Sequence, residues 1–269
     1  QTVTANLVSN TKGVHYYTAS ISSIANEKNT KNNYKSFSVE VLDEQTKVLL
    51  LSSFLHPDLG ALKKAIESNK QRKVDIALIQ DKNINLDAYQ FFVLYQPNSY
   101  FKTTLEKKQS NFLLVSGTKT DWNFLNSQGL GVQKRVINQK EEYTAIYNAD
   151  FLTFYQEDIG FGQFPPLKDK FGEVQTKKES QSLLYQKYAG VETTQPLLST
   201  FEENDKKYAV LFGEGIWKWR AASYLKEKNF ESFDTFVGNL VQYLASTKKR
   251  RRLDVKAQRL YAANEPITI

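Results

Sequence analysis

The residues that could perform covalent catalysis are few, and they form one candidate set. The chain of 269 residues has no cysteine, which excludes a thiolate nucleophile, a disulfide and a cysteine-based metal site. A serine hydroxyl can act as a nucleophile only if a base removes its proton. Ser116 follows the apolar run NFLLV, His56 follows KVLLLSSFL, and Glu214 follows KYAVLFG. Ser116 as nucleophile with His56 and Glu214 is therefore the catalytic site that the residue types permit.

Metal and cofactor sites are not predicted. The two histidines, His15 and His56, lie in different parts of the chain, which disfavours a zinc site built on histidine. The glycine pairs at 129–131 and 160–162 neither follow a strand nor open a helix at the spacing of a phosphate loop. The adjacent acids Glu141 and Glu142 would point to opposite faces of a strand. We expect no metal and no cofactor.

The charge pattern favours a solvated surface over a nucleic-acid interface. The chain carries 36 Lys and Arg against 29 Asp and Glu, a net charge of +7, and the bases are spread along its length. The densest basic run, KKRRR at 248–252, follows an amphipathic segment, which favours a linker over a site for nucleic acid or anionic lipid. No run of about 18 apolar residues predicts a membrane span.

From residue 47, short apolar runs alternate with helical patterns. The runs KVLLLSS, VDIALI, FFVLYQP and NFLLVSG have the unbroken apolar character of strands that are buried on both faces. The segments LGALKKAIESN and YFKTTLEKKQ have helical spacing. Strands and helices in this order predict an α/β fold with a doubly wound, mostly parallel sheet.

The second half of the chain is less regular. VQKRVINQKEEYTAIY is predicted to be extended and DIGFGQFPPLKDKFG to be a loop, whereas SLLYQKY, PLLSTF and KKYAVLF are predicted strands. FGEGIWKWR is interpreted as a strand end, with Trp217 and Trp219 on one face and Lys218 on the other. The segment 230–247 is a predicted helix that packs on the sheet. Its apolar stripe is Phe233, Phe236, Val237, Leu240, Val241 and Leu244.

Two alternating segments precede this region and indicate a separate unit. GVHYYTASISSI and NYKSFSVEVLD alternate apolar and polar residues on either side of an Asn-rich turn. Because two strands are not stable alone, residues 1–45 are interpreted as the closing part of a β-sandwich. Residues 46–248 would then form the α/β domain, and residues 249–269 a basic linker with the start of another β module. A chain that starts at Gln1 is expected to be a piece of a longer protein.

Four stretches carry a resemblance to a known family: KVLLLSSFLHPDLGALKKAIESN, FPPL at 164–167, GEGIWKWR and FDTFVGNLVQYL. Over residues 47–247 the chain resembles the class I glutamine amidotransferase-like domain of large bacterial membrane-anchored proteins, which also contain von Willebrand A and immunoglobulin-like modules. The resemblance implies a flavodoxin-like fold with an immunoglobulin-like N-terminal segment. It also implies a Bacteroidetes-type envelope protein on the periplasmic side, anchored by segments outside this chain, with neighbouring domains or envelope proteins as partners.

The catalytic residues of that family are absent from the matching positions. Working members use a cysteine nucleophile and a histidine in a strand end of the form Phe-His-Pro-Glu. The aligned stretch here is FGEG at 212–215, so Gly213 replaces the base and the acid has moved. His56 could still approach Ser116, but His-Pro-Asp before a helix is more simply a capping arrangement with Asp58 in the first turn. The comparison with the family therefore favours a non-catalytic binding or scaffolding module.

A ligand crevice is expected at the carboxyl edge of the sheet, where open α/β sheets bind their ligands. Its lining residues would be Ser53, His56, Ser116, Thr118, Glu214 and Trp217. Two alternatives remain open. One is a hydrolase or amidotransferase-like enzyme with Ser116 as its nucleophile, and the other is a carbohydrate-binding module that uses Trp217, Trp219 and Tyr224.

Overall fold

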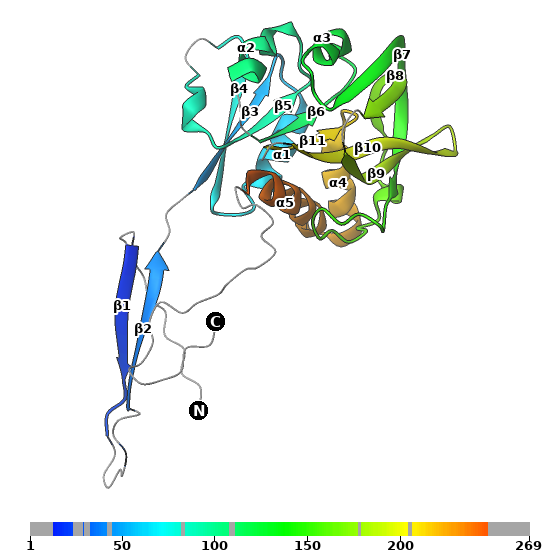
Figure 1. Ribbon diagram of the computed structural model, residues 1–269. Helices are drawn as coiled ribbons and strands as arrows, with labels where there is room; N and C mark the ends of the chain where they lie inside the picture. Colours follow the sequence, from blue (N-terminus) through cyan, green and yellow to red (C-terminus); the bar gives the residue numbers. More distant parts are fainter. Residues whose placement is uncertain are drawn as a thin grey trace. The chain divides into compact units, whose positions relative to one another are not determined.

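The chain divides into two compact units in the computed structural model (Figure 1). The first contains Gln1–Glu44 and Lys248–Ile269, and the second contains Gln45–Thr247. The structure describes residues 13–23, 29, 33–41, 45–81, 84–107, 111–176, 179–203 and 206–246. Of these residues, 44% lie in strands and 27% in helices, so the molecule is dominated by β-structure.

The described part of the first unit is an antiparallel pair of strands. β1 (Gly13–Ser20) pairs with β2 (Tyr34–Val41), and Ser20 lies opposite Tyr34. Both strands are predicted correctly from their alternating patterns. The immunoglobulin-like sandwich stays a prediction, because most of this unit, including the KKRRR linker and NEPITI, lies outside the described residues.

The second unit is built on one mixed sheet of nine strands in the order β4-β3-β5-β6-β11-β10-β9-β7-β8. The first five strands in this order run parallel, and each later pair is antiparallel. The parallel strands are β3 (Thr46–Ser52), β4 (Arg72–Leu78), β5 (Phe91–Tyr95), β6 (Phe112–Val115) and β11 (Lys206–Leu211). The others are β7 (Val132–Tyr147), β8 (Leu167–Thr176), β9 (Ser180–Tyr188) and β10 (Val191–Glu203).

The predicted doubly wound, mostly parallel flavodoxin-like fold is therefore wrong. Parallel neighbours need long crossovers, usually helices, whereas antiparallel neighbours can be joined by short turns. The chain from β7 to β10 adds four strands with no α-helix between them in the described residues. Three of these strands are predicted from the sequence, but Leu167–Thr176, predicted as part of a loop, is strand β8.

Helices cover both faces of the parallel part of the sheet (Figure 1). α1 (Pro57–Ile66), α4 (Ile216–Glu227) and α5 (Glu231–Ala245) contact one another on one face. α2 (Lys102–Lys107) and α3 (Trp122–Ser127) lie on the other. The described 3₁₀ turns are η2 (Leu86–Ala88), η3 (Ser99–Phe101) and η4 (Phe161–Gln163).

The apolar stripe predicted for α5 is confirmed. The buried residues of the helix are the six expected from helical spacing: Phe233, Phe236, Val237, Leu240, Val241 and Leu244. Burying one side chain of this kind contributes about 1.5–3 kcal/mol relative to leaving it exposed. Arg220 of α4 donates from Nε to Asp234 Oδ1 of α5 at 2.8 Å, which also joins the two helices.

The stretch IWKWR is helical, so the strand prediction for it is wrong. It opens α4, and residues two apart on a helix point to nearly opposite sides. Trp219 is 1% exposed and donates from Nε1 to the carbonyl oxygen of Pro165 at 2.7 Å, whereas Trp217 is 40% exposed. Gly213 and Gly215, with φ of +139° and +107°, make the turn from β11 into the helix. These left-handed conformations favour glycine.

The antiparallel strands curl back toward the parallel part of the sheet. Lys168 of β8 exchanges two backbone hydrogen bonds of 2.9 and 2.8 Å with Glu214, which follows β11. Further along β8, the Val174 amide donates to Gln195 Oε1 of β10 at 2.7 Å. These bonds satisfy part of the free edge of β8, which reduces its tendency to pair with another chain.

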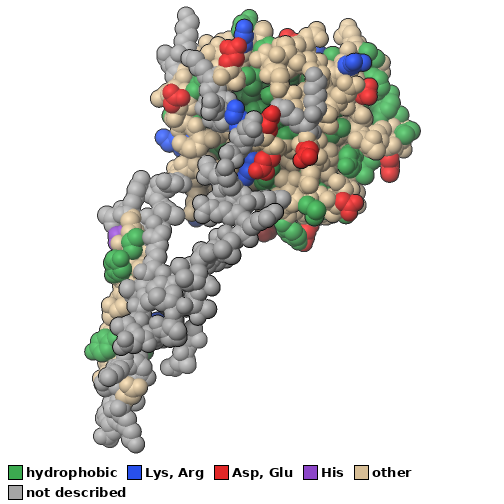
Figure 2. Space-filling model, in the orientation of Figure 1, with side chains coloured by type: hydrophobic (Ala, Val, Ile, Leu, Met, Phe, Trp, Pro, Cys, Tyr) green, Lys and Arg blue, Asp and Glu red, His purple; other side chains and the backbone are tan. Residues whose placement is uncertain are grey.

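Acidic and basic side chains are interspersed on the face of the second unit seen in Figure 2, without a continuous basic patch on that face. A basic patch is the usual electrostatic footprint of nucleic-acid binding. The expectation that nucleic acid is not a partner nevertheless stays a prediction. In the described part of the chain, no helix is long and apolar enough to cross a membrane.

Candidate functional site

The carboxyl ends of four parallel strands meet at one edge of the sheet. Ser52 of β3, Tyr95 of β5, Val115 of β6 and Leu211 of β11 are neighbours in the strand register. The segments that follow these strands carry the residues predicted to line a crevice. The sheet topology thus places those segments together, and the side-chain contacts decide which of the residues meet.

His56 belongs to a hydrogen-bonded cluster with Tyr95 and Asp58. The Tyr95 hydroxyl donates to Asp58 Oδ2 at 2.8 Å and lies 2.7 Å from His56 Nδ1. The His56 and Tyr95 rings stack with their centroids 5.3 Å apart. The Asp58 side chain is fully buried, whereas the His56 side chain is 23% exposed. His56 is therefore the member of the cluster that solvent can reach.

Two helices begin at this cluster. His56 is the N-cap of α1, and its Nδ1 accepts from the Asp58 amide at 3.2 Å, so the predicted capping arrangement is confirmed. The Asp58 carboxylate also caps α4, because it accepts from the amides of Gly215 at 2.7 Å and Trp217 at 2.9 Å. A carboxylate between two helix N-termini is stabilised by both helix dipoles. No sequence pattern indicates this second bond, which joins residues 157 positions apart.

The cluster raises the pKa of two of its members. The hydrogen bond to Asp58 raises the pKa of His56 above its ordinary value, burial opposes the rise, and the charges of Asp58 and Glu214 add to it. Burial, followed by the charge of Asp58, raises the pKa of Tyr95, so the phenol keeps its proton. A neutral His56 accepts at Nδ1 from the Asp58 amide, whereas a protonated Nδ1 donates to Asp58 or Tyr95. When His56 takes up a proton, Nδ1 therefore stops accepting from the Asp58 amide at the start of α1, and the ring forms an ion pair with the Asp58 carboxylate instead.

Glu214 faces the same edge and is held by two side chains. Gln96 Nε2 and Thr118 Oγ1 donate to its carboxylate, the latter at 2.9 Å. Gln96 is fully buried, has a left-handed φ of +46°, and accepts from the Lys119 amide at 2.7 Å through Oε1. A Cβ at Gly117 would lie 2.5 Å from the end of the Gln96 side chain, so another residue there would displace this amide from its position. Backbone strain of this kind concentrates at binding and catalytic sites.

Ser116 lies in a different and fully buried cluster. Its hydroxyl donates to Asp169 Oδ2 at 2.7 Å, and Lys134 Nζ donates to the same oxygen at 2.9 Å. All three side chains are at 0% exposure. Burial lowers the pKa of Lys134, and the charge of Asp169 opposes that shift. The ammonium group is also within 5.7–5.9 Å of the ring centroids of Trp122, Tyr143 and Phe212.

The three residues of the candidate catalytic set are thus not assembled. Ser116 bonds to Asp169, while the side-chain partners of His56 are Asp58 and Tyr95. Ser116 also has no exposed surface from which to attack a substrate. The sequence places Ser116 after β6 correctly, but its partner comes from β8, a strand that was predicted as a loop.

Gly213 occupies the position at which the resemblance expects a histidine base. A Cβ at this position would lie 2.7 Å from the Cβ of Leu167, the first residue of β8. Leu167 is itself fully buried. Because β8 is held against this turn by the backbone bonds between Lys168 and Glu214, a side chain at Gly213 would require the strand to move.

The remaining predicted residues lie on the surface of this edge or on α4. Ser53 Oγ accepts from Asn98 Nδ2 at 3.2 Å. Trp217 and Tyr224 are 40% and 44% exposed, but the buried Trp219 is not available to a carbohydrate. Among the described residues, no group of three or more His, Cys, Asp or Glu could hold a metal ion. The side chains available at this edge are therefore those of His56, Glu214 and Trp217, and the described residues around them form no metal-binding cluster.

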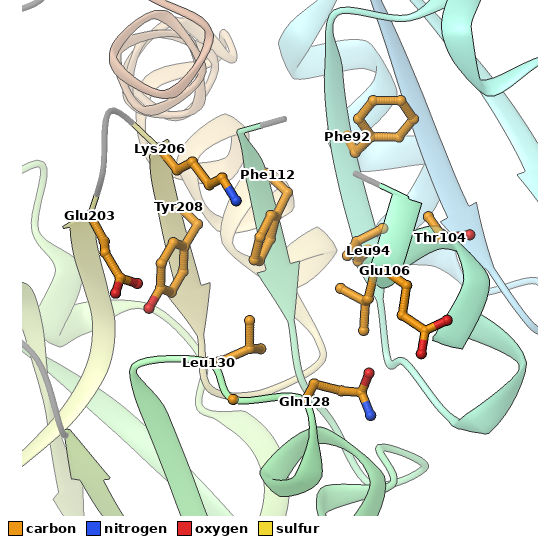
Figure 3. A pocket seen from close by; sticks show the side chains of 12 residues that line it. Phe92, Leu94, Thr104, Glu106, Phe112, Gln128, Leu130, Glu203, Lys206 and Tyr208 are labelled. Carbon is orange, nitrogen blue, oxygen red and sulfur yellow. The ribbon is translucent and has the colours of Figure 1, made fainter. Parts of the chain in front are cut away.

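An apolar cavity of about 240 Å³ lies beside α2 and α3 (Figure 3). Phe112 and Tyr208, whose ring centroids are 5.1 Å apart, form one part of its wall; Leu130 lies below them and Leu94 lies beside Phe112. A helix of six residues spans only about 9 Å, so α2 and α3 leave part of the sheet uncovered. None of the residues predicted for the crevice lines this cavity.

Comparisons with known proteins give weak structural similarities. No protein-family model matches the sequence, and no curated protein does. A GH42 β-galactosidase from G. stearothermophilus is 9% identical over 74% of this chain, with a TM-score of 0.45. A β-galactosidase from the psychrophilic Marinomonas ef1 is 14% identical over 76%, with a TM-score of 0.39. The chain spans 30% of the length of each galactosidase.

A further solved structure is weakly similar over nearly its whole length. It is a GMP synthase subunit from Thermoplasma acidophilum, 10% identical over 74% of this chain and 96% of its own, with a TM-score of 0.37. At this TM-score the resemblance to amidotransferases stays a prediction. The von Willebrand A and immunoglobulin-like modules, the envelope location and the Bacteroidetes source also stay predictions.

Proposed function

We propose that this protein is a non-catalytic binding or scaffolding module. The observation that carries the proposal is the burial of Ser116 against Asp169, away from the hydrogen-bonded partners of His56. A nucleophile needs both a base within hydrogen-bond reach and access to its substrate. The lack of space for a side chain at Gly213 further supports the proposal, because a second base cannot be accommodated without movement of β8.

The module would use the carboxyl edge of the parallel strands for binding. His56, Thr118, Glu214 and Trp217 supply a titratable ring, a hydroxyl, a carboxylate and an exposed indole there. Neighbouring domains of the same chain or envelope proteins are the proposed partners. This assignment, like the periplasmic location and the anchoring through segments outside this chain, rests on the sequence resemblance alone.

An assay of the full chain for ammonia release from glutamine, with a serine-directed fluorophosphonate probe in parallel, tests the absence of catalysis. We expect no ammonia above the buffer rate and no labelling of Ser116. Ammonia release that Ser116→Ala abolishes, or labelling of Ser116 that His56→Ala prevents, would contradict the proposal. Ser53→Ala is the matched control, because Ser53 follows β3 at the same edge of the sheet and has a hydroxyl outside the buried cluster.

A further inference from the structure

A polar pocket lies among the antiparallel strands and shares no residue with the carboxyl edge. It has a volume of about 360 Å³ and is lined by residues of β8, β9, β10 and the segment after β7. This volume is within the range of about 300–1,000 Å³ that is usual for small-ligand sites. Most of its lining side chains carry hydroxyl or amide groups, in contrast to the apolar cavity beside α2.

An irregularity in β10 produces this pocket. Glu192 pairs with Lys187 and Pro196 with Tyr185, so β10 has two more residues than β9 between these pairs. Proline has no amide hydrogen and is tolerated where a strand bulges. The extra residues leave the regular ladder, which places Thr194 and Gln195 in the lining of the pocket.

Two glutamines in the lining have their amide groups oriented by the protein. Gln195 Oε1 accepts from the Val174 amide at 2.7 Å. Gln181 Oε1 accepts from the Leu152 amide at 3.1 Å and from Thr153 Oγ1 at 2.8 Å. An oxygen that accepts these bonds leaves the Nε2 group as a donor. Neither Nε2 has a hydrogen-bond partner among the described residues.

The other lining groups restrict the chemistry of a ligand. Asp150 is the only charged residue in the described lining, which contains no lysine, arginine or histidine. Within this described lining, a phosphate or sulfate finds no cationic partner, and a divalent cation finds fewer oxygen anions than it requires. Ser180 and Thr194 add hydroxyls, and the half-buried ring of Tyr185 adds an apolar surface. A neutral ligand with many hydroxyl groups matches this combination.

We propose that the pocket between β8, β9 and β10 binds a neutral saccharide. The Nε2 groups of Gln181 and Gln195 donate to its hydroxyl or ring oxygens, Asp150 accepts from its hydroxyls, and a sugar face lies on Tyr185. An extended peptide is disfavoured at the same place, because strand addition needs free backbone donors and the Val174 amide is already bound to Gln195. This pocket contains none of Trp217, Trp219 and Tyr224, the α4 residues that the carbohydrate-binding alternative would use.

NMR titration of the ¹⁵N-labelled full chain tests the proposal. The probes are neutral tetrasaccharides of glucose, xylose, mannose, galactose and N-acetylglucosamine, each taken to millimolar concentration. At least one is expected to shift the side-chain amide signals of Gln181 and Gln195. Gln195→Glu keeps the oxygen that accepts from Val174 but removes the donor, and it should weaken binding about tenfold. Thr194→Val, which removes an exposed hydroxyl, provides a second variant with little effect on the strand pairing.

Gln175→Glu is the matched control. Gln175 lies on β8 between Val174 and Thr176, which line the pocket, so its side chain points to the opposite face. It introduces the same charge close to the pocket and should leave affinity unchanged. If none of the tetrasaccharides shifts the two amide signals, or if both Gln175→Glu and Gln195→Glu weaken binding equally, the proposal fails. Shifts confined to Trp217 and Tyr224 would also overturn it, whereas the outcome of the ammonia assay leaves it unaffected.

Discussion

Two polar clusters in this molecule have similar chemical groups and opposite access to solvent. The edge cluster joins His56, Tyr95 and Asp58, and the buried cluster joins Lys134, Ser116 and Asp169. Each contains a basic group, a hydroxyl and a carboxylate. The difference is that the His56 side chain is 23% exposed, whereas every side chain of the buried cluster is at 0%.

Solvent access decides what each cluster can do. A buried ion pair gains little net stability over an apolar replacement, but removal of one partner leaves an uncompensated charge. The buried cluster therefore holds β6, β7 and β8 in one arrangement and has no exposed reacting group. The edge cluster can take up a proton without unfolding, because solvent reaches His56. Residue type alone would have assigned Ser116 and His56 to one site.

The largest expected effect comes from breaking the buried ion pair. Lys134→Met should lower the free energy of unfolding by about 3–5 kcal/mol, because Asp169 would be left fully buried without its ammonium partner. Urea unfolding followed by circular dichroism measures the change. In the double variant Lys134→Met with Asp169→Leu, no buried charge remains, and a large part of the lost stability should return. A loss below about 1 kcal/mol for the single variant would show that the pair is not buried as described.

The second-largest effect on stability is expected at Gly213, where Leu167 of β8 leaves no room for a side chain. Gly213→Ala combines a left-handed φ of +139° with a Cβ placed 2.7 Å from Leu167, and it should cost about 3 kcal/mol. Gly190→Ala separates these two causes, since Gly190 also has a positive φ of +82° but open space where a Cβ would lie. It should cost only about 1 kcal/mol. Equal losses in the two variants, measured by thermal unfolding, would mean that β8 moves aside easily.

The sequence predicts many elements of this molecule but not how the clusters form. The apolar stripe of α5 and the cap at His56 depend on residues that are close together in the sequence, so local spacing is sufficient to predict them. The bond from Asp58 to α4 spans 157 positions, and the bond from Ser116 to Asp169 depends on the curl of β8. Neither of these two bonds corresponds to a periodic pattern in the sequence. The interpretation of IWKWR as a strand failed because alternation over five residues does not distinguish a strand end from the first turn of a helix.

The third effect compares a buried with a more exposed helix cap. Asp58→Asn keeps one acceptor oxygen but loses the charge and an acceptor shared by Gly215 and Tyr95, so it should cost about 2 kcal/mol. Asp121→Asn is the control, because Asp121 caps α3 through the Phe124 amide at 3.0 Å and Asn is an equally good N-cap. Its cost should be below about 0.5 kcal/mol. Comparable losses in urea unfolding would remove the distinction between the two caps.

The smallest effect is a pH dependence that only the edge cluster can supply. The pKa of His56 is raised in the folded protein, chiefly by the hydrogen bond to Asp58, so the folded state binds this proton more tightly than the unfolded state. The resulting stabilisation is fully present below about pH 6.5, the ordinary value, and is lost as the pH rises through the folded-state value. His56→Asn retains a cap for α1 but has no titrating group. The free energy of unfolding of the wild-type chain should therefore fall between about pH 6 and pH 8 more steeply than that of His56→Asn. Identical slopes would place the titrating group elsewhere, and Asp58→Asn should reduce the slope in the same direction, because it removes the partner that raises the pKa.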